Sequence, residues 1–149
     1  MLANTNTTMT VDQTTFTITF HRRLTAPRER VFDAWTTPEH VQHWWDPSGA
    51  RLAECTIDLR PGGEFKFTNQ GHHHSPPFAG TYRLVERPSR LVFDALGALG
   101  TVSLETSNGG TQMTVSIQCS SAEHLAHFIQ LGVADGTGKT LDNLVTYLA

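Results

Sequence analysis

The chain has 149 residues, of which 38% are hydrophobic and 17% are charged, and its formal net charge is -3. These values fit one ordinary globular domain and give no electrostatic reason to expect nucleic acid or an anionic membrane as a partner. Residues 1–13 lack the basic start and apolar core of a signal peptide, and no apolar run approaches the roughly 18 residues of a membrane span. We therefore expect a cytoplasmic protein with a flexible start over residues 1–13 and a single domain over residues 14–149.

The first part of that domain predicts one strand and two short helices. Apolar residues alternate with threonines over residues 14–24, which is the pattern of a half-buried strand. Pro27 stands where the first turn of a helix tolerates proline, and apolar residues at helical spacing follow it. A second helix begins at Thr37 as its cap and ends at the turn residues 46–49.

Two adjacent tryptophans, Trp44 and Trp45, end this second helix. Neighbouring residues on a helix point about 100° apart, so both rings cannot pack into one flat face of the core. We therefore expect one of them to line something other than the main core: a second layer, the mouth of a cavity, or a ligand.

Alternating apolar residues then predict further strands in close succession. The runs are residues 53–59, 65–67, 82–84, 91–95, 102–104 and 113–119. Pro61-Gly62 and Asn108-Gly109 are turn signals between strands, and residues 97–100 are interpreted as a loop. Cys55 and Cys119 lie inside strand-like runs, where free buried thiols are a better interpretation than a disulfide.

The end of the chain predicts a long helix. Ser120 and Glu123 form a capping box, and the pattern continues from there to residue 148. Gly132, Gly136 and Gly138 interrupt it, and each costs a helix interior about 1 kcal/mol relative to alanine. Two interpretations stay open and are compatible: the helix bends at the glycines, or the glycines face inward and leave space beneath it.

The order of these elements predicts the fold class. Strands and helices do not alternate, so a parallel sheet is not expected, and short links between strands favour an antiparallel meander. We predict an α+β fold: a curved antiparallel sheet of about six to seven strands wrapped around a long C-terminal helix, with two short helices after strand one. Such a sheet tends to enclose a cavity beneath its helix. The edge strands of the meander leave a homodimer possible.

Several short motifs, taken in order, resemble those of the START-like (SRPBCC, helix-grip) superfamily, and in particular its branch named after the activator of the heat-shock-protein ATPase. The resemblance covers residues from about 14 to 148. The motifs are residues 23–27, 31–35, Pro38-Glu39, Trp44-Trp45, and residues 58–63, 80–82, 90–92, 109–111 and 136–148. One departure is that Thr137 and Gly138 stand after Gly136, where the family commonly has a tryptophan, so the pocket is expected to be roomier there.

The resemblance implies a helix-grip fold with a hydrophobic cavity between the sheet and the long helix. The leading hypothesis is a domain that binds a small hydrophobic or amphipathic molecule. One alternative is an enzyme on the same fold, cyclase- or hydrolase-like, acting on an aromatic or polyketide-like substrate; a polar cluster at the cavity floor would favour it. Another is a chaperone-associated interaction module, which predicts an exposed apolar patch and no enclosed void.

Aromatic residues are numerous enough to line such a pocket, although some of them must form packed core. The sequence does not decide which strand face points inward. The residues predicted to line the pocket are Trp35, Trp45, Phe65, Phe67, Phe78, Tyr82, Phe93 and Phe128, with Gly132 and Gly136 giving room beneath the helix.

Metal and cofactor signals are weak. His72 and His74 could share a metal ion, since alternate residues of an extended segment point the same way, but a tight site needs three or four ligands. An exposed polar loop is the preferred interpretation, and no metal is predicted. The sequence has no phosphate loop, dinucleotide fingerprint or nucleophile elbow, so no cofactor and no catalytic residue are predicted, while acid–base chemistry stays open.

Overall fold

The computed structural model describes residues 7–70 and 77–149, which form one eight-stranded antiparallel sheet and four helices. The strands are β1 (Thr8–Asp12), β2 (Thr17–Leu24), β3 (Glu54–Ile57), β4 (Glu64–Thr68), β5 (Phe78–Glu86), β6 (Arg90–Ala95), β7 (Ala98–Ser107) and β8 (Gly110–Gln118). The helices are α1 (Arg28–Thr36), α2 (Pro38–Trp44), α3 (Ala122–Gln130) and α4 (Val133–Leu148).

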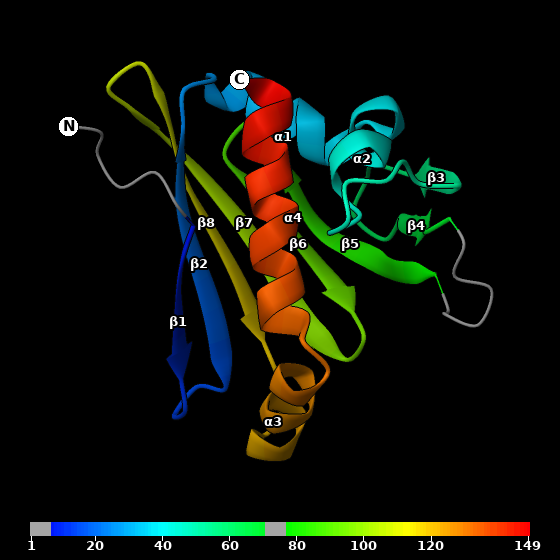
Figure 1. Ribbon diagram of the computed structural model, residues 1–149, viewed down its shortest axis with the longest axis vertical. Helices are drawn as coiled ribbons and strands as arrows, with labels where there is room; N and C mark the ends of the chain where they lie inside the picture. Colours follow the sequence, from blue (N-terminus) through cyan, green and yellow to red (C-terminus); the bar gives the residue numbers. More distant parts are fainter. Residues whose placement is uncertain (1–6, 71–76) are drawn as a thin grey trace.

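The sheet is curved, and α4 crosses one of its faces (Figure 1). The strand order is β1-β2-β8-β7-β6-β5-β4-β3, so the chain meanders from β3 to β8 and the N-terminal strands complete the far edge. Helices α1 and α2 cover one end of the sheet and α3 lies at the other end of α4 (Figure 1). The predicted α+β helix-grip fold is therefore confirmed, with eight strands rather than six to seven.

The additional strand is β1, which corrects the expectation of a flexible start for residues 8–12. It pairs with β2 in antiparallel register, Val11 opposite Ile18. Its side chains are mostly exposed, and only Val11 is half-buried. An edge strand with one partner and little burial has a weak apolar alternation, which is why the sequence did not reveal it.

A second correction concerns residues 97–100, which were expected to form a loop. The link from β6 to β7 is only Leu96 and Gly97, both with positive φ (56° and 78°), and Ala98 through Gly100 already belong to β7. Two consecutive positive φ values are typical of a tight two-residue hairpin. Leucine rarely adopts them, so the sequence lacked the signal that Asn108 and Gly109 give at the next hairpin, where φ is 49° and 79°.

The C-terminal helix is divided in two, as the bend interpretation expected. Gly132 adopts φ 80° between α3 and α4, and its carbonyl accepts from the amide of Gly136. The N-cap of α3 is Ser121, whose hydroxyl accepts from the amide of His124 at 3.1 Å. The cap predicted at Ser120 is thus shifted by one residue to Ser121, and the amide of Ser120 donates to His124 Nδ1.

Side-chain size changes along the face of α4 that covers the sheet. In its second half Leu141, Leu144 and Leu148 are buried and pack into the core. In its first half the positions on the same side are Gly136, Thr137 and Thr140, which are much smaller. Helix residues three and four apart share a face, so the first half of α4 stands over the sheet with less side-chain volume beneath it than the second half.

Candidate functional site

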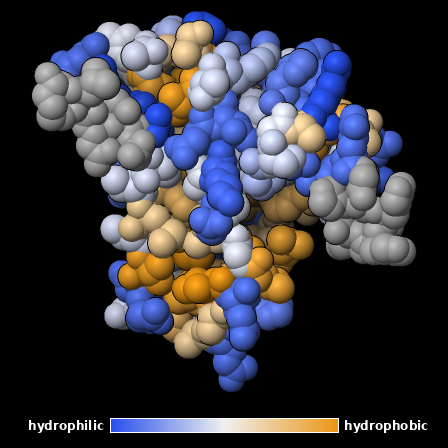
Figure 2. Space-filling view, viewed as in Figure 1, coloured by the Kyte–Doolittle hydropathy of each residue, from blue (hydrophilic) through white to orange (hydrophobic). Residues whose placement is uncertain are grey.

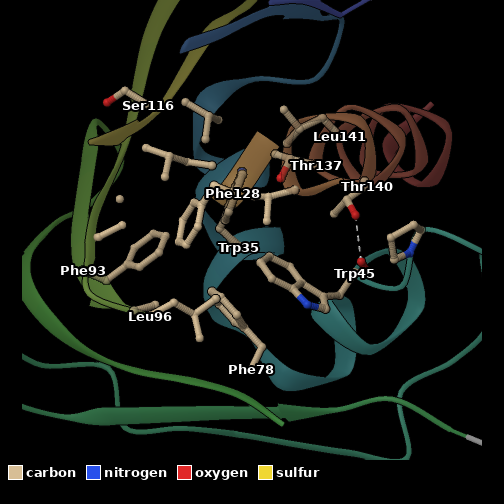
Figure 3. A pocket seen from close by; sticks show the side chains of 18 residues that line it. Trp35, Trp45, Phe78, Phe93, Leu96, Ser116, Phe128, Thr137, Thr140 and Leu141 are labelled. Carbon is tan, nitrogen blue, oxygen red and sulfur yellow. Dashed lines mark hydrogen bonds between the residues drawn. The ribbon is translucent and has the colours of Figure 1, made fainter. Parts of the chain in front are cut away.

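A cavity of about 250 Å³ lies between the first half of α4 and the sheet (Figure 3). Its walls come from every helix except α2, from four of the eight strands and from the segments between them. They are formed by Trp35, Trp45, Pro47, Phe78, Phe93, Ala95, Leu96, Ala98, Gly100, Val115, Ser116, Ile117, Phe128, Val133, Gly136, Thr137, Thr140 and Leu141. An engineered apolar cavity of about 150 Å³ is large enough for benzene, so this one has room for a larger ring system.

The sheet side of the cavity depends on small residues. Gly100 on β7 faces Phe93 on β6, and a Cβ atom at Gly100 would lie 2.5 Å from Phe93 Cε2. Real Cβ atoms do not approach so closely, so glycine is what allows the Phe93 ring to lie flat over β7 rather than project further into the cavity. Ala95 and Ala98 flank the same hairpin and add little side-chain volume.

The adjacent residues Trp44 and Trp45 have different roles at the aromatic end of the cavity. Trp44 is 0% exposed, and its indole N–H donates to the carbonyl of Ala34 at 3.1 Å. Trp45 instead lines the cavity, with its ring centroid 5.0 Å from that of Phe78 and 5.7 Å from that of Trp44. Thr140 ties this end to α4, because its hydroxyl donates to the carbonyl of Trp45 at 2.9 Å (Figure 3).

Three of the predicted pocket residues, Phe65, Phe67 and Tyr82, lie behind this wall. They pack around a void of only about 10 Å³, which they share with Trp35, Trp45, Phe78, Leu91 and Phe93. A void of that size is at the lower limit for one water molecule, so it offers no room for an organic ligand. The three rings are buried and form a packed aromatic layer between the cavity and the outer strands.

The other predicted residues divide as follows. Trp35, Trp45, Phe78, Phe93, Phe128 and Gly136 lie in the cavity wall. Gly132 does not: it is exposed at the bend between α3 and α4, and a Cβ placed there would have nothing within 4 Å. Position 132 therefore requires glycine because its φ is positive, and not because the helix needs space beneath it. His72 and His74 lie outside the described residues.

Replacing Gly132 with alanine is therefore expected to affect stability and not binding. The left-handed conformation costs a residue with a Cβ about 1–2 kcal/mol, so the free energy of unfolding should fall by that amount. Urea denaturation would measure the loss, and the affinity for a cavity ligand should equal that of the parent. A clear loss of affinity at unchanged stability would mean that Gly132 contributes to the wall after all.

Sequence reasoning missed the small and aliphatic members of the wall, such as Ala95, Ala98, Val115, Ile117 and Val133. Apolar residues of this kind look the same in a packed core and in a cavity wall. Two signals were available: Gly100 inside a strand, which often marks a close approach, and the change from small to large residues along α4.

One end of the cavity reaches the surface at the β6–β7 turn. Leu96 lines the cavity and is 57% exposed, and Ile129 and Leu131 near the end of α3 are exposed as well. Figure 2 shows hydrophobic residues gathered in this lower part of the molecule, over α3 and the start of α4. His124 fastens α3 to the turn, with its Nε2 3.2 Å from the carbonyl oxygen of Leu96.

The cavity wall carries no ionisable side chain among the residues that the structure describes. Its polar side chains are those of Trp35, Trp45, Ser116, Thr137 and Thr140, and the Thr140 hydroxyl already has its acceptor. The thiols offer no nucleophile nearby: burial, together with Glu39, raises the pKa of Cys55 to about 11, and burial also raises the pKa of Cys119. A thiol with a raised pKa stays protonated and unreactive at neutral pH.

Within residues 7–70 and 77–149, no group of three or more His, Cys, Asp or Glu side chains is placed to hold a metal ion. No helix in the same part of the chain is both long enough and apolar enough to cross a membrane.

The curved antiparallel sheet, the long C-terminal helix across it and the apolar cavity between them define a START-like helix-grip protein. The chain belongs to the family described as "Activator of Hsp90 ATPase homolog 1-like protein", whose pattern matches residues 25–149. Among curated proteins, none matches the sequence.

Solved structures with the same fold come from several bacteria. A protein from Rhodobacter sphaeroides is 22% identical with a TM-score of 0.85, covering 96% of this chain and 97% of its own. Protein Ms6760 from Mycobacterium smegmatis is 21% identical with a TM-score of 0.82, covering 95% and 97%. CalU16 from Micromonospora echinospora is 22% identical with a TM-score of 0.65, covering 97% and 85%. At this level of identity the likeness establishes the fold alone.

Proposed function

We propose that the chain binds a small hydrophobic or amphipathic molecule without a formal charge in the cavity beneath α4. The observation that carries this proposal is a cavity of about 250 Å³ whose described walls hold no ionisable side chain. Burying apolar surface there gains roughly 25 cal/mol per Å², whereas an unpaired charge would lose its hydration with nothing to replace it.

The two alternatives find less support. An acid–base enzyme needs a titratable group within hydrogen-bond reach of its substrate, and the described wall supplies none. An interaction module would use a patch of exposed apolar residues, and Leu96, Ile129 and Leu131 are exposed. Leu96, however, also lines the cavity, so its exposure is better explained by a place at the cavity mouth.

The test is equilibrium dialysis of the purified protein against two probes of similar size, 2-isopropenylnaphthalene and 2-naphthoate. The neutral hydrocarbon should bind with one site per chain, and the carboxylate should bind at least about tenfold more weakly, because no cationic side chain in the described wall balances its charge. Equal binding of both probes, or binding of neither, would contradict the proposal. Native mass spectrometry of freshly purified protein would in addition reveal a molecule carried from the host.

A further inference from the structure

The described residues contain three buried side-chain polar atoms without a hydrogen-bond partner: Arg22 Nε, Trp35 Nε1 and Thr68 Oγ1. Only Trp35 belongs to the cavity wall, where it borders both the large cavity and the small void beside it. The residue is 7% exposed, so its indole N–H has little access to bulk water. A buried donor left without an acceptor costs about 1–3 kcal/mol, which sets this atom apart from the rest of the wall.

The contrast with the neighbouring ring is informative. Trp44 packs edge-on against Trp35 with 5.0 Å between centroids, and its own N–H is satisfied by the carbonyl of Ala34. Trp45 also contacts Trp35 edge-on, with 6.4 Å between centroids, and lies 5.7 Å from Trp44. The Trp35 ring thus belongs to a cluster of three mutually contacting indoles, which restricts the movement of its donor before any ligand arrives. A fixed donor loses little conformational entropy on binding.

We propose that Trp35 Nε1 is the polar recognition point of the cavity and that the ligand is an uncharged aromatic or alicyclic molecule carrying one hydrogen-bond acceptor, such as a ketone, aldehyde or ester carbonyl. This inference rests on the proposed function and narrows it to a chemical class. The apolar wall supplies affinity for the ring system, and the buried, unpaired donor of Trp35 selects molecules that place an acceptor against it. An acceptor-free hydrocarbon of the same shape leaves the donor unsatisfied.

Two isosteric probes separate this inference from the proposed function. 2-Acetylnaphthalene and 2-isopropenylnaphthalene differ only in carrying C=O or C=CH₂ at the same place. The ketone should bind about tenfold more tightly, which corresponds to about 1.4 kcal/mol. In a ¹H–¹⁵N spectrum the indole N–H resonance of Trp35, assigned by its loss in Trp35→Phe, should move downfield with the ketone and not with the hydrocarbon.

Variants at two positions provide the controls. Trp35→Phe keeps an aromatic ring but removes the donor, so the preference for the ketone should be lost. Trp45→Phe removes the other indole of the wall and should retain the preference for the ketone. Equal binding of both probes to the parent, or a preference that survives in Trp35→Phe, would overturn the assignment of Trp35 while leaving the proposed function intact. Binding of neither probe would overturn both.

Discussion

Replacing Gly136 with phenylalanine should weaken the binding of 2-acetylnaphthalene by about tenfold or more while the protein stays folded. Gly136 lies in the cavity wall on the first half of α4, where a Cβ would sit 3.8 Å from Pro47 Cγ in ordinary contact. The backbone therefore tolerates the substitution, and the ring must occupy space that the ligand needs. Forcing both into one cavity costs about 1–3 kcal/mol, and this cost appears as lost affinity.

Gly138 provides the matched control for this variant. It is in the same helix, two residues further on, and a Cβ placed there would have nothing within 4 Å. Gly138 is not part of the cavity wall, so Gly138→Phe should bind the probe as the parent does. Both variants remove a glycine from a helix interior and so share the same gain in helix propensity. An equal loss of affinity in both variants would show that the effect comes from the helix and not from the cavity.

Truncating Trp44 should produce the largest loss of stability of the variants considered. Its side chain is 0% exposed and its N–H has a backbone acceptor, so Trp44→Ala leaves a large internal void and an unsatisfied carbonyl at Ala34. Truncation of a buried tryptophan to alanine costs about 3–5 kcal/mol, a large share of the stability of an ordinary domain. Urea denaturation would measure it, and Trp44→Phe serves where the alanine variant does not accumulate.

Trp45→Ala should behave differently, although it changes the next residue in the chain. Trp45 is only half-buried and borders an existing cavity, so the loss of stability should be smaller, about 1–3 kcal/mol. Its removal takes away the ring that contacts Phe67 and Phe78 and enlarges the cavity, so probe affinity should fall. If Trp44→Ala lost binding at wild-type stability, or Trp45→Ala were the less stable of the two, the roles assigned to the two rings would be reversed.

The overall architecture could be predicted because it depends on strong patterns. Alternation in the central strands, the Asn108-Gly109 turn and the order of elements lead directly to a curved sheet with a long helix. The features that the sequence did not predict rest on weak or unusual signals. Strand β1 buries almost nothing, and the β6–β7 turn places Leu96 in a conformation that leucine rarely adopts.

The candidate site could be predicted only in part. Because adjacent helical residues point in different directions, the sequence predicts that Trp44 and Trp45 have different roles. It cannot separate Phe67 from Phe78, which are direct partners across β4 and β5, although Phe78 borders the cavity and Phe67 lies behind it. Which of the two rings borders the cavity depends on the curvature of the sheet, and the sequence of a single strand does not predict that curvature. Gly132 illustrates a second limit, since a glycine chosen for its φ and one chosen for space look identical in a sequence.

The change from small side chains in the first half of α4 to leucines in the second half affects how the protein can evolve. The leucines of the second half anchor the helix to the core, whereas Gly136 and Thr137 face a space that nothing in the fold requires to have a particular shape. Substitutions at those two positions can remodel ligand preference while the anchoring half is untouched. One helix thus separates a region that must stay constant for folding from a region free to diversify, and new specificities can arise without passing through unstable intermediates.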